Sequence, residues 1–125
     1  IKARERYMSH THEAIDYVEF PAADMAATKA FFEQAFGWVF TDYGPEYTAF
    51  NRNGIEGGFF KSHLRSNSDE GAALLIFYSD NLEETEQKIM RSGGLITKAI
   101  FAFPGGRRFH FTCPSGNEFA VWSET

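Results

Sequence analysis

The sequence predicts an α+β domain built from two tandem β-α-β-β-β modules, whose curved mixed sheets enclose a cavity. Two observations favour this fold class. Strand-like and helix-like segments follow the same order twice along a chain of 125 residues, a length that fits one domain or two small repeated modules. Landmarks also recur, since Thr28 matches Thr85 and Gly54 matches Gly116 at an offset of about 60 residues, which indicates an internal duplication.

The first module is expected over residues 12–62. Ile15–Phe20 has the composition of a short strand, and Pro21 is expected to end it. Asp24 is suited to cap a helix over Met25–Phe36, because apolar residues recur there at helical spacing. Three more strand-like segments complete this module: Trp38–Tyr43, Tyr47–Asn51 and Ile55–Lys61.

A polar linker over residues 63–71 leads to the second module, which is expected over residues 72–124. Ala73–Tyr78 is strand-like, and Asn81 is suited to cap a helix over Leu82–Ser92. Turn-forming sequences rich in proline and glycine separate the strand-like segments that follow. These segments are Leu95–Phe101, Arg108–Cys113 and Glu118–Trp122.

Each module would contain one helix and four strands, so the helix can cover only one face of its sheet. The other face must be covered by the second module or line a cavity, and we expect the ligand in that cavity. The single domain would span residues 12–125. Residues 1–11 are expected to be a flexible arm or a remnant of an expression vector.

Composition excludes several classes of function. The formal net charge of −5 disfavours binding to a phosphate backbone, so no nucleic-acid partner is expected. The absence of a long apolar run predicts no membrane partner. Cys113 is the single cysteine, which excludes an internal disulfide and is typical of a cytoplasmic protein. The 14 phenylalanines indicate either a phenylalanine-rich core or an aromatic pocket.

Two segments resemble the vicinal-oxygen-chelate superfamily, which includes glyoxalases, bleomycin-resistance proteins and dioxygenases. VEFPAADMAATKAFFEQAFGW resembles the first strand, helix and Gly-aromatic turn of that family. CPSGNEFAVWSE resembles its closing turn and strand, with Cys113 and Ser115 in place of two acids. The resemblance covers residues 13–124. It implies the doubled fold and, for many members, metal-dependent lyase, isomerase or dioxygenase chemistry.

The resemblance also implies up to four metal ligands, usually His or Glu, on the first and last strands of each module. Carried over to this chain, the four positions are Tyr17, Gly58, Leu74 and Ala120. Three of them offer no donor side chain, and a lone tyrosine is a rare ligand for zinc or ferrous iron. We therefore expect no metal and no other cofactor, which disfavours the metal-dependent reactions.

Strand alternation predicts which residues share the cavity face with those four positions. They combine aromatic walls with carboxylates, which suits an aromatic or cationic small molecule. The expected ligand-binding residues are Tyr17, Glu19, Phe60, Tyr78, His110, Glu118 and Trp122. Candidates for acid–base catalysis are Glu118, His110 and Glu56. The alternatives are aromatic core packing, a hydrogen-bonded structural histidine and solvated carboxylates at strand ends.

The leading hypothesis is a metal-free protein of the bleomycin-resistance type that sequesters a small aromatic or cationic molecule. One alternative is an enzyme with lyase-like or isomerase-like activity and an atypical site that uses Glu and His. Another is a non-catalytic interaction or regulatory module. A homodimer is expected, because open sheet edges and cavity faces in so short a chain need covering. Whether the modules pair within one chain or between two chains stays open.

Overall fold

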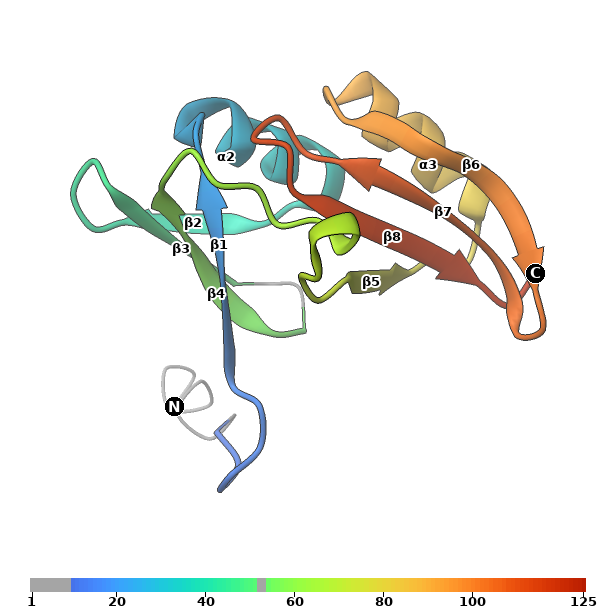
Figure 1. The fold of residues 1–125 in the computed structure, drawn as a ribbon, viewed down its shortest axis with the longest axis horizontal. Helices are drawn as coiled ribbons and strands as arrows, with labels where there is room; N and C mark the ends of the chain where they lie inside the picture. The colour runs from blue at the N-terminus through green and yellow to red at the C-terminus, as the bar shows by residue number, and fades with distance from the viewer. Residues whose placement is uncertain (1–9, 52–53) are drawn as a thin grey trace.

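The computed structural model describes residues 10–51 and 54–125, and it confirms an α+β fold with two modules of the same element order (Figure 1). Residues 1–9 of the expected arm lie outside the described residues. The first module contains β1 (Tyr17–Ala22), α2 (Met25–Phe36), β2 (Val39–Asp42), β3 (Tyr47–Asn51) and β4 (Glu56–Lys61). After a linker with the short 3-10 turn η1 (Ser68–Glu70), the second module contains β5 (Leu75–Tyr78), α3 (Leu82–Arg91), β6 (Leu95–Phe103), β7 (Gly106–Thr112) and β8 (Glu118–Ser123).

The two sheets have the same topology. Their strand orders are β1-β4-β3-β2 and β5-β8-β7-β6, and the first and last strands of each module pair in parallel. The other pairs are antiparallel. Three of the four positions implied by the family resemblance lie on these paired strands, and the fourth, Leu74, directly precedes β5.

Several expected boundaries differ from the observed ones, and two of the differences change how the sheets are understood. Pro21 does not end the first strand but lies within β1, where it pairs with Phe60 of β4. A proline is tolerated here because β1 is an edge strand, whose outer side needs no backbone N–H donor. The strand expected over Arg108–Cys113 begins earlier, at Gly106, which pairs with Phe103. The turn between β6 and β7 is therefore shorter than expected, with Pro104 and Gly105 alone at its tip.

The helix termini follow the sequence prediction. The carboxylate of Asp24 accepts a hydrogen bond from the backbone N–H of Ala27 at 3.0 Å, and Gly37 ends α2 in the left-handed region with φ of 70°. The side chain of Asn81 accepts from the N–H of Glu84 at 3.2 Å. No helix in the described part of the chain is long and apolar enough to cross a membrane.

A phenylalanine-rich core joins the modules through α2. The ring of Phe32 lies 5.7 Å from Phe59 of β4 and 5.5 Å from Phe119 of β8. Phe36 stacks on Phe77 of β5 with 4.5 Å between ring centroids. The modules of one chain thus pack through the helix-covered faces of their sheets, which leaves the opposite face of each sheet open.

Candidate functional site

A hydrogen-bonded cluster of two tyrosines and a glutamate lies on the open face of the first sheet. The hydroxyl of Tyr47 donates to Glu19 Oε2 at 2.8 Å and lies 2.7 Å from the hydroxyl of Tyr17. Since the single proton of Tyr47 goes to Glu19, Tyr17 must donate to Tyr47. Burial, then the hydrogen bonds to Tyr17 and Glu19, raise the pKa of Tyr47 far above its ordinary value. Tyr47 therefore remains a neutral phenol at physiological pH.

This cluster occupies the space of one family metal position. A side chain at Gly58 would collide with the hydroxyl of Tyr47 and would lie 2.9 Å from the backbone oxygen of Thr48. Tyr17, at the first position, already uses its hydroxyl in the cluster. In the second module, Leu74 precedes β5 and Ala120 pairs with Ile76, so neither offers a donor. The residues at the family's metal positions do not fit a divalent metal.

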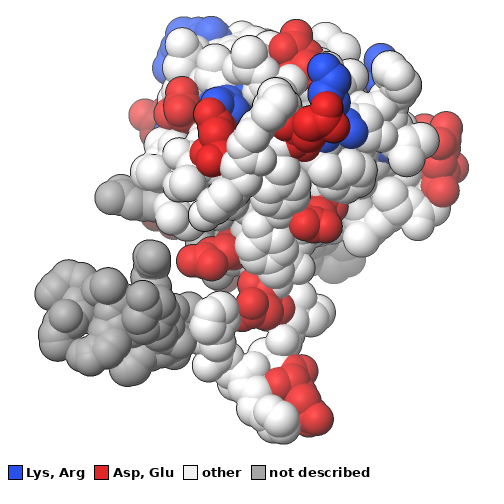
Figure 2. All heavy atoms as spheres, turned by 90° about the vertical axis from the view of Figure 1, so that its left-hand side faces the viewer, with Lys and Arg blue, Asp and Glu red and all other residues white. Residues whose placement is uncertain are grey.

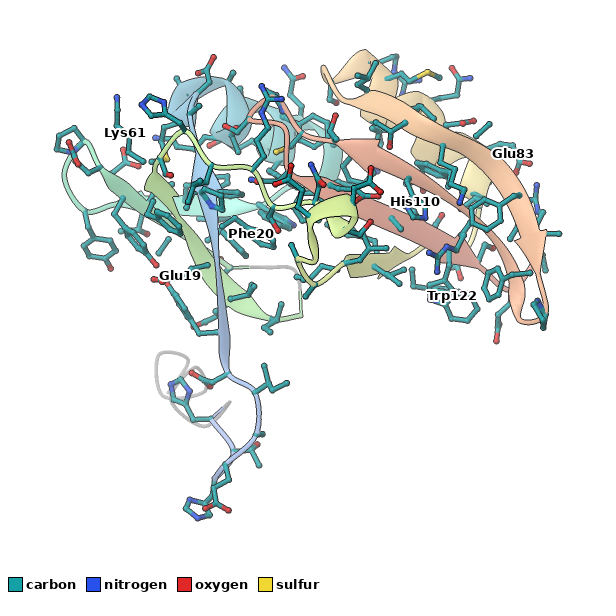
Figure 3. All side chains as sticks on the ribbon, in the orientation of Figure 1. Glu19, Phe20, Lys61, Glu83, His110 and Trp122 are labelled. Carbon is teal, nitrogen blue, oxygen red and sulfur yellow. The ribbon has the colours of Figure 1, made fainter. Side chains whose placement is uncertain are left out.

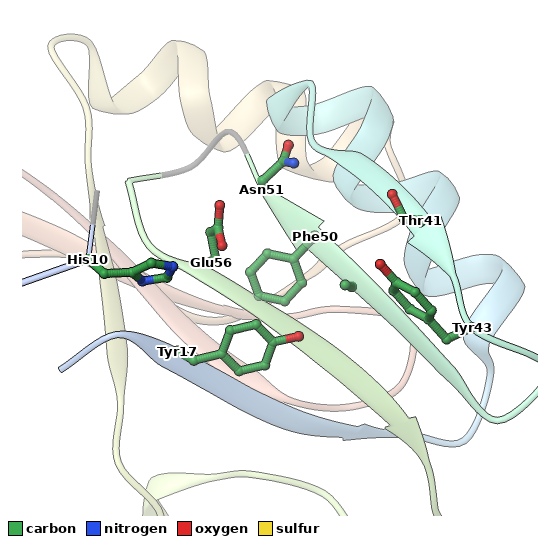
Figure 4. Close-up of a pocket in the computed structure, with 8 residues that line it drawn as sticks. His10, Tyr17, Thr41, Tyr43, Phe50, Asn51 and Glu56 are labelled. Atoms are coloured by element: carbon green, nitrogen blue, oxygen red, sulfur yellow. The ribbon is translucent and has the colours of Figure 1, made fainter. Parts of the chain in front are cut away.

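A hollow of about 220 Å³ adjoins the cluster (Figure 4). Its lining includes Tyr17, Tyr43, Asn51, Glu56 and His10. Strand alternation correctly placed Tyr17 and Glu56 on this face. The imidazole of His10 lies 2.6 Å from a carboxylate oxygen of Asp16, and this hydrogen bond raises the pKa of His10.

Negative charge dominates the surroundings of this hollow. Figure 2 shows carboxylates distributed down this side of the molecule, whereas lysine and arginine gather at its upper end. Glu19 belongs to the tyrosine cluster, and Glu56 lines the hollow. Rings and carboxylates together give a surface that attracts cations by charge and by the negative faces of the aromatic rings.

On the open face of the second sheet, the structure brings His110 and Glu118 together. Nδ1 of His110 lies 2.8 Å from Glu118 Oε2, and Nε2 lies 3.0 Å from a guanidinium nitrogen of Arg108. Because the guanidinium can only donate, Nε2 accepts, and Nδ1 carries the proton that is donated to Glu118. Both nitrogens of this buried imidazole are therefore occupied, which favours a structural role.

Glu118 also fastens the linker to the sheet. Its Oε1 accepts hydrogen bonds at 2.8 Å from both the backbone N–H and the hydroxyl of Ser68. Burial raises the pKa of Glu118, but hydrogen bonds from His110 and Ser68 outweigh it and hold that pKa below its ordinary value. A polar hollow of about 290 Å³ adjoins this pair, and the buried Oδ1 of Asn67 beside it has no hydrogen-bond partner among the described residues.

The remaining predicted residues complete the two open faces. Trp122 and Tyr78 pack edge to face at 5.1 Å on the second sheet, and Phe60 lies half-buried on the first sheet opposite Tyr47. Figure 3 shows Glu19 on one sheet and His110 and Trp122 on the other. Within one chain, the predicted ligand residues thus form two groups on two sheets and not one enclosed site.

Sequence reasoning missed Tyr47, Tyr43 and His10. Strand alternation was applied to the first and last strands of the first module, and the same alternation on Tyr47–Asn51 would have placed Tyr47 on the open face. His10 was assigned to an arm, and its position depends on Asp16, a contact that no sequence spacing indicates.

The matching family model is that of the glyoxalase/bleomycin resistance protein/dioxygenase superfamily, over residues 14–121. No curated protein matches the chain significantly. Similar solved structures include a genomically encoded fosfomycin resistance protein from Listeria monocytogenes, with 15% identity over 92% of this chain and 96% of that chain and a TM-score of 0.75.

A glyoxalase-related enzyme from Fulvimarina pelagi has 16% identity over 89% of this chain and 88% of that chain, with a TM-score of 0.74. A lactoylglutathione lyase from Agrobacterium tumefaciens has 19% identity over 91% of this chain and 96% of that chain, with a TM-score of 0.67. These structures establish likeness of fold. Together with the family match over most of its length, they show that the chain belongs to the glyoxalase/bleomycin resistance protein/dioxygenase superfamily.

Proposed function

We propose that this protein binds a small aromatic cation on the open face of its first sheet, without a divalent metal, and sequesters it in the manner of a bleomycin-resistance protein. The observation that supports this most strongly is the Tyr17–Tyr47–Glu19 cluster over Gly58. It places two phenol rings and a carboxylate where the family's metal chemistry would need donor side chains. The neighbouring hollow adds the carboxylate of Glu56.

The size and charge of the hollow define the ligand class. A space of about 220 Å³ exceeds the roughly 150 Å³ that holds benzene, so one or two fused rings fit. The rings of Tyr17 and Tyr43 and the carboxylate of Glu56 line the hollow, and Glu19 of the adjoining cluster adds a second negative charge nearby. A permanent cation on a planar ring gains from both features.

We also propose a cytoplasmic homodimer. Large apolar side chains are exposed on and beside the open faces, including Ile76 at 46% and Tyr78 at 50%. The second sheet carries Lys98 and Arg108 beside aromatic rings, which complements the carboxylates of the first sheet. Light scattering at micromolar concentration tests the dimer, and a monomer mass would contradict it. The buried free thiol of Cys113 accords with a reducing compartment.

Calorimetric titration tests the binding proposal. N-methylquinolinium and neutral quinoline at pH 8 share one ring system and differ in charge, and we expect the cation to bind with a dissociation constant in the ~micromolar range. Glu56→Gln should weaken the cation about fivefold and quinoline much less. The matched control is Glu33→Gln on the exposed side of α2, which removes the same charge without touching the hollow.

Two further measurements bear on the proposal. Elemental analysis of protein purified without chelator should give far less than one equivalent of zinc, nickel, iron or manganese. Stoichiometric metal that survives dialysis would overturn the metal-free assignment. If a broad panel of aromatic cations neither binds nor raises the melting temperature, the interaction-module alternative gains ground.

The enzymatic alternative depends on the His110–Glu118 pair beside the polar hollow. A carboxylate that orients an imidazole is a common arrangement for a general base. Here the base nitrogen accepts from Arg108, so catalysis would require that guanidinium to move. A lyase or isomerase activity that is lost in His110→Gln and gained in Arg108→Gln would favour this alternative over binding.

A further inference from the structure

A third and chemically different cavity lies between the modules. It has a volume of about 410 Å³, and its walls come from β1, β3, β5, β8 and the segments that lead into β2 and β4. Six lining side chains define its character: Val18, Phe20, Trp38, Phe50, Leu75 and Phe77. None of the described residues that line it carries a charge.

Most of this cavity lies on the helix-covered side of the sheets, although Phe50 also lines the hollow beside the tyrosine cluster and Tyr78 reaches it from the open face of the second sheet. Val18 and Phe20 alternate along β1 with Tyr17 and Glu19, so they point to the helix-covered side of the first sheet. Phe119 likewise alternates with its open-face neighbours along β8. The cavity therefore opens beside the phenylalanine-rich core, on the side of the sheets opposite to the tyrosine cluster.

Apolar space of this size is unusual next to a close-packed core. Protein interiors leave few voids larger than a water molecule, and a cavity of roughly 150 Å³ with apolar walls already binds benzene. Water in this cavity would find few hydrogen-bonding partners on walls of aromatic and aliphatic carbon. An apolar occupant would gain dispersion contacts with the walls that line the cavity.

Trp38 is held rigidly at the wall. Its ring stacks against Phe32 at 4.1 Å and against Phe50 at 4.3 Å, and only 5% of the residue is exposed. Access is available at the edge strand β5, where Ile76 and Tyr78 are about half exposed. The wall is thus preformed on the Trp38 side and open on the β5 side, as expected of a small-molecule site.

We propose that this cavity between the modules binds an uncharged planar apolar molecule of one or two rings. The site is distinct from the cation site of the first sheet, with Phe50 as the one described lining residue that the two have in common. It differs from that site in face, charge and ligand class. A protein with both sites would hold an apolar ring system on one side of the sheets and a cationic ring on the other.

Tryptophan fluorescence tests this proposal, because the two tryptophans lie on opposite faces. Bromobenzene is apolar, and its bromine quenches an indole that it contacts. In Trp122→Phe protein, which retains Trp38, we expect saturable quenching with a dissociation constant of about 10–100 μM. Trp38→Phe protein, which retains Trp122, should show only weak linear quenching. N-methylpyridinium, a cation of similar size, should not compete.

Cavity-filling variants identify the site. In the Trp122→Phe background, Val18→Phe should weaken bromobenzene binding by about tenfold or more, since the added ring takes the space of the ligand. Val39→Phe is the matched control, because Val39 is 45% exposed on β2 and does not line the cavity. Leu75→Phe, with Leu95→Phe as its control, repeats the test if Val18→Phe fails to fold.

Absence of saturable quenching in the Trp122→Phe protein would overturn the proposal. Equal weakening by Val18→Phe and Val39→Phe would also overturn it. Neither result would affect the cation site, which is measured with N-methylquinolinium and Glu56→Gln.

Discussion

The N-termini of α2 and α3 are held by the same kinds of hydrogen bond, yet the serine that makes them comes from different places in the chain. In the second module, Ser79 Oγ lies 2.6 Å from Thr85 Oγ1 and accepts from the backbone N–H of the N-cap residue at 3.0 Å. In the first module, Ser115 Oγ lies 2.6 Å from Thr28 Oγ1 and accepts from the N-cap N–H at 3.1 Å. The second module thus supplies its own serine, whereas the first module takes its serine from the second.

This difference shows that the two repeats are not interchangeable. Ala22 stands at the first-module position that corresponds to Ser79, so no local hydroxyl is present there. Ser115 belongs to the closing turn of the second module and also donates to the backbone oxygen of Asp24 at 3.2 Å. Helix α2 therefore has a local cap at Asp24 but depends on the other module for its serine contacts, and the chain should fold as one unit.

The strongest test of that unity is Phe119→Ala. Phe119 is fully buried, and its ring lies 5.1 Å from Phe20 and 5.5 Å from Phe32 in the first module. We expect the free energy of unfolding to fall by about 3–5 kcal/mol. Urea unfolding followed by circular dichroism and by Trp38 fluorescence should still give one coincident transition. Two separate transitions, or a loss no larger than that of the exposed control Leu95→Ala, would contradict the inference.

A smaller effect is expected when the borrowed serine is removed. Ser115→Ala removes the bond between Ser115 and the buried Thr28 hydroxyl and should lower the free energy of unfolding by about 1–3 kcal/mol. Ser79→Ala should lower the free energy of unfolding by less, because the hydrogen bond between Ser79 and Thr85 is only partly buried. Adding Ala22→Ser to Ser115→Ala would place a local hydroxyl as in the second module. Partial recovery of the melting temperature would support the inference that α2 takes its serine from the second module. Equal losses of stability in Ser115→Ala and Ser79→Ala would contradict it.

Most of the fold was predictable because its determinants are local. Asp24 and Asn81 cap the helices as expected, and repeated segment order predicted the duplication. Pro21 was misjudged because only the sheet topology shows that β1 is an edge strand. The contact between Ser115 and Thr28 joins residues far apart in sequence, and no spacing rule predicts it.

The sequence predicted on which face of each sheet the candidate residues lie, but it did not predict which of their side chains contact one another. Strand alternation placed Tyr17, His110 and Glu118 on open faces. It could not show that His110 meets Glu118, because that depends on the register in which His110 pairs with Ala120. Whether the two groups of predicted ligand residues act together also depends on assembly, which a single sequence does not specify.

Acid should weaken the second module through Glu118. The folded pKa of this carboxyl lies below its ordinary value of 4.5, so its stabilising contribution is present above that value and is lost as pH falls through the folded pKa. Glu118→Gln should lower the free energy of unfolding by about 1 kcal/mol at neutral pH. The stability of this variant should also fall less steeply as the pH is lowered. Melting temperatures of both proteins across this range measure the effect. Glu33→Gln is the control. If Glu118→Gln protein loses stability in acid as steeply as the unmodified protein, the role given to Glu118 is contradicted.

The smallest expected signal is that of Trp122 on the second open face. Trp122 shares its face with Ala120, pairs with Arg108 in register and packs against Tyr78. The proposed cation site lies on the other sheet, so Trp122 responds only if the second face covers that site in the homodimer.

We expect N-methylquinolinium to change the fluorescence of Trp38→Phe protein, which retains Trp122, saturably and in proportion to calorimetric binding. Trp122→Phe protein should bind the cation and give little change. Diluting the protein below the dimer dissociation constant should remove the Trp122 signal. Calorimetric binding with a silent Trp122 at every concentration would show that the first sheet binds the cation alone.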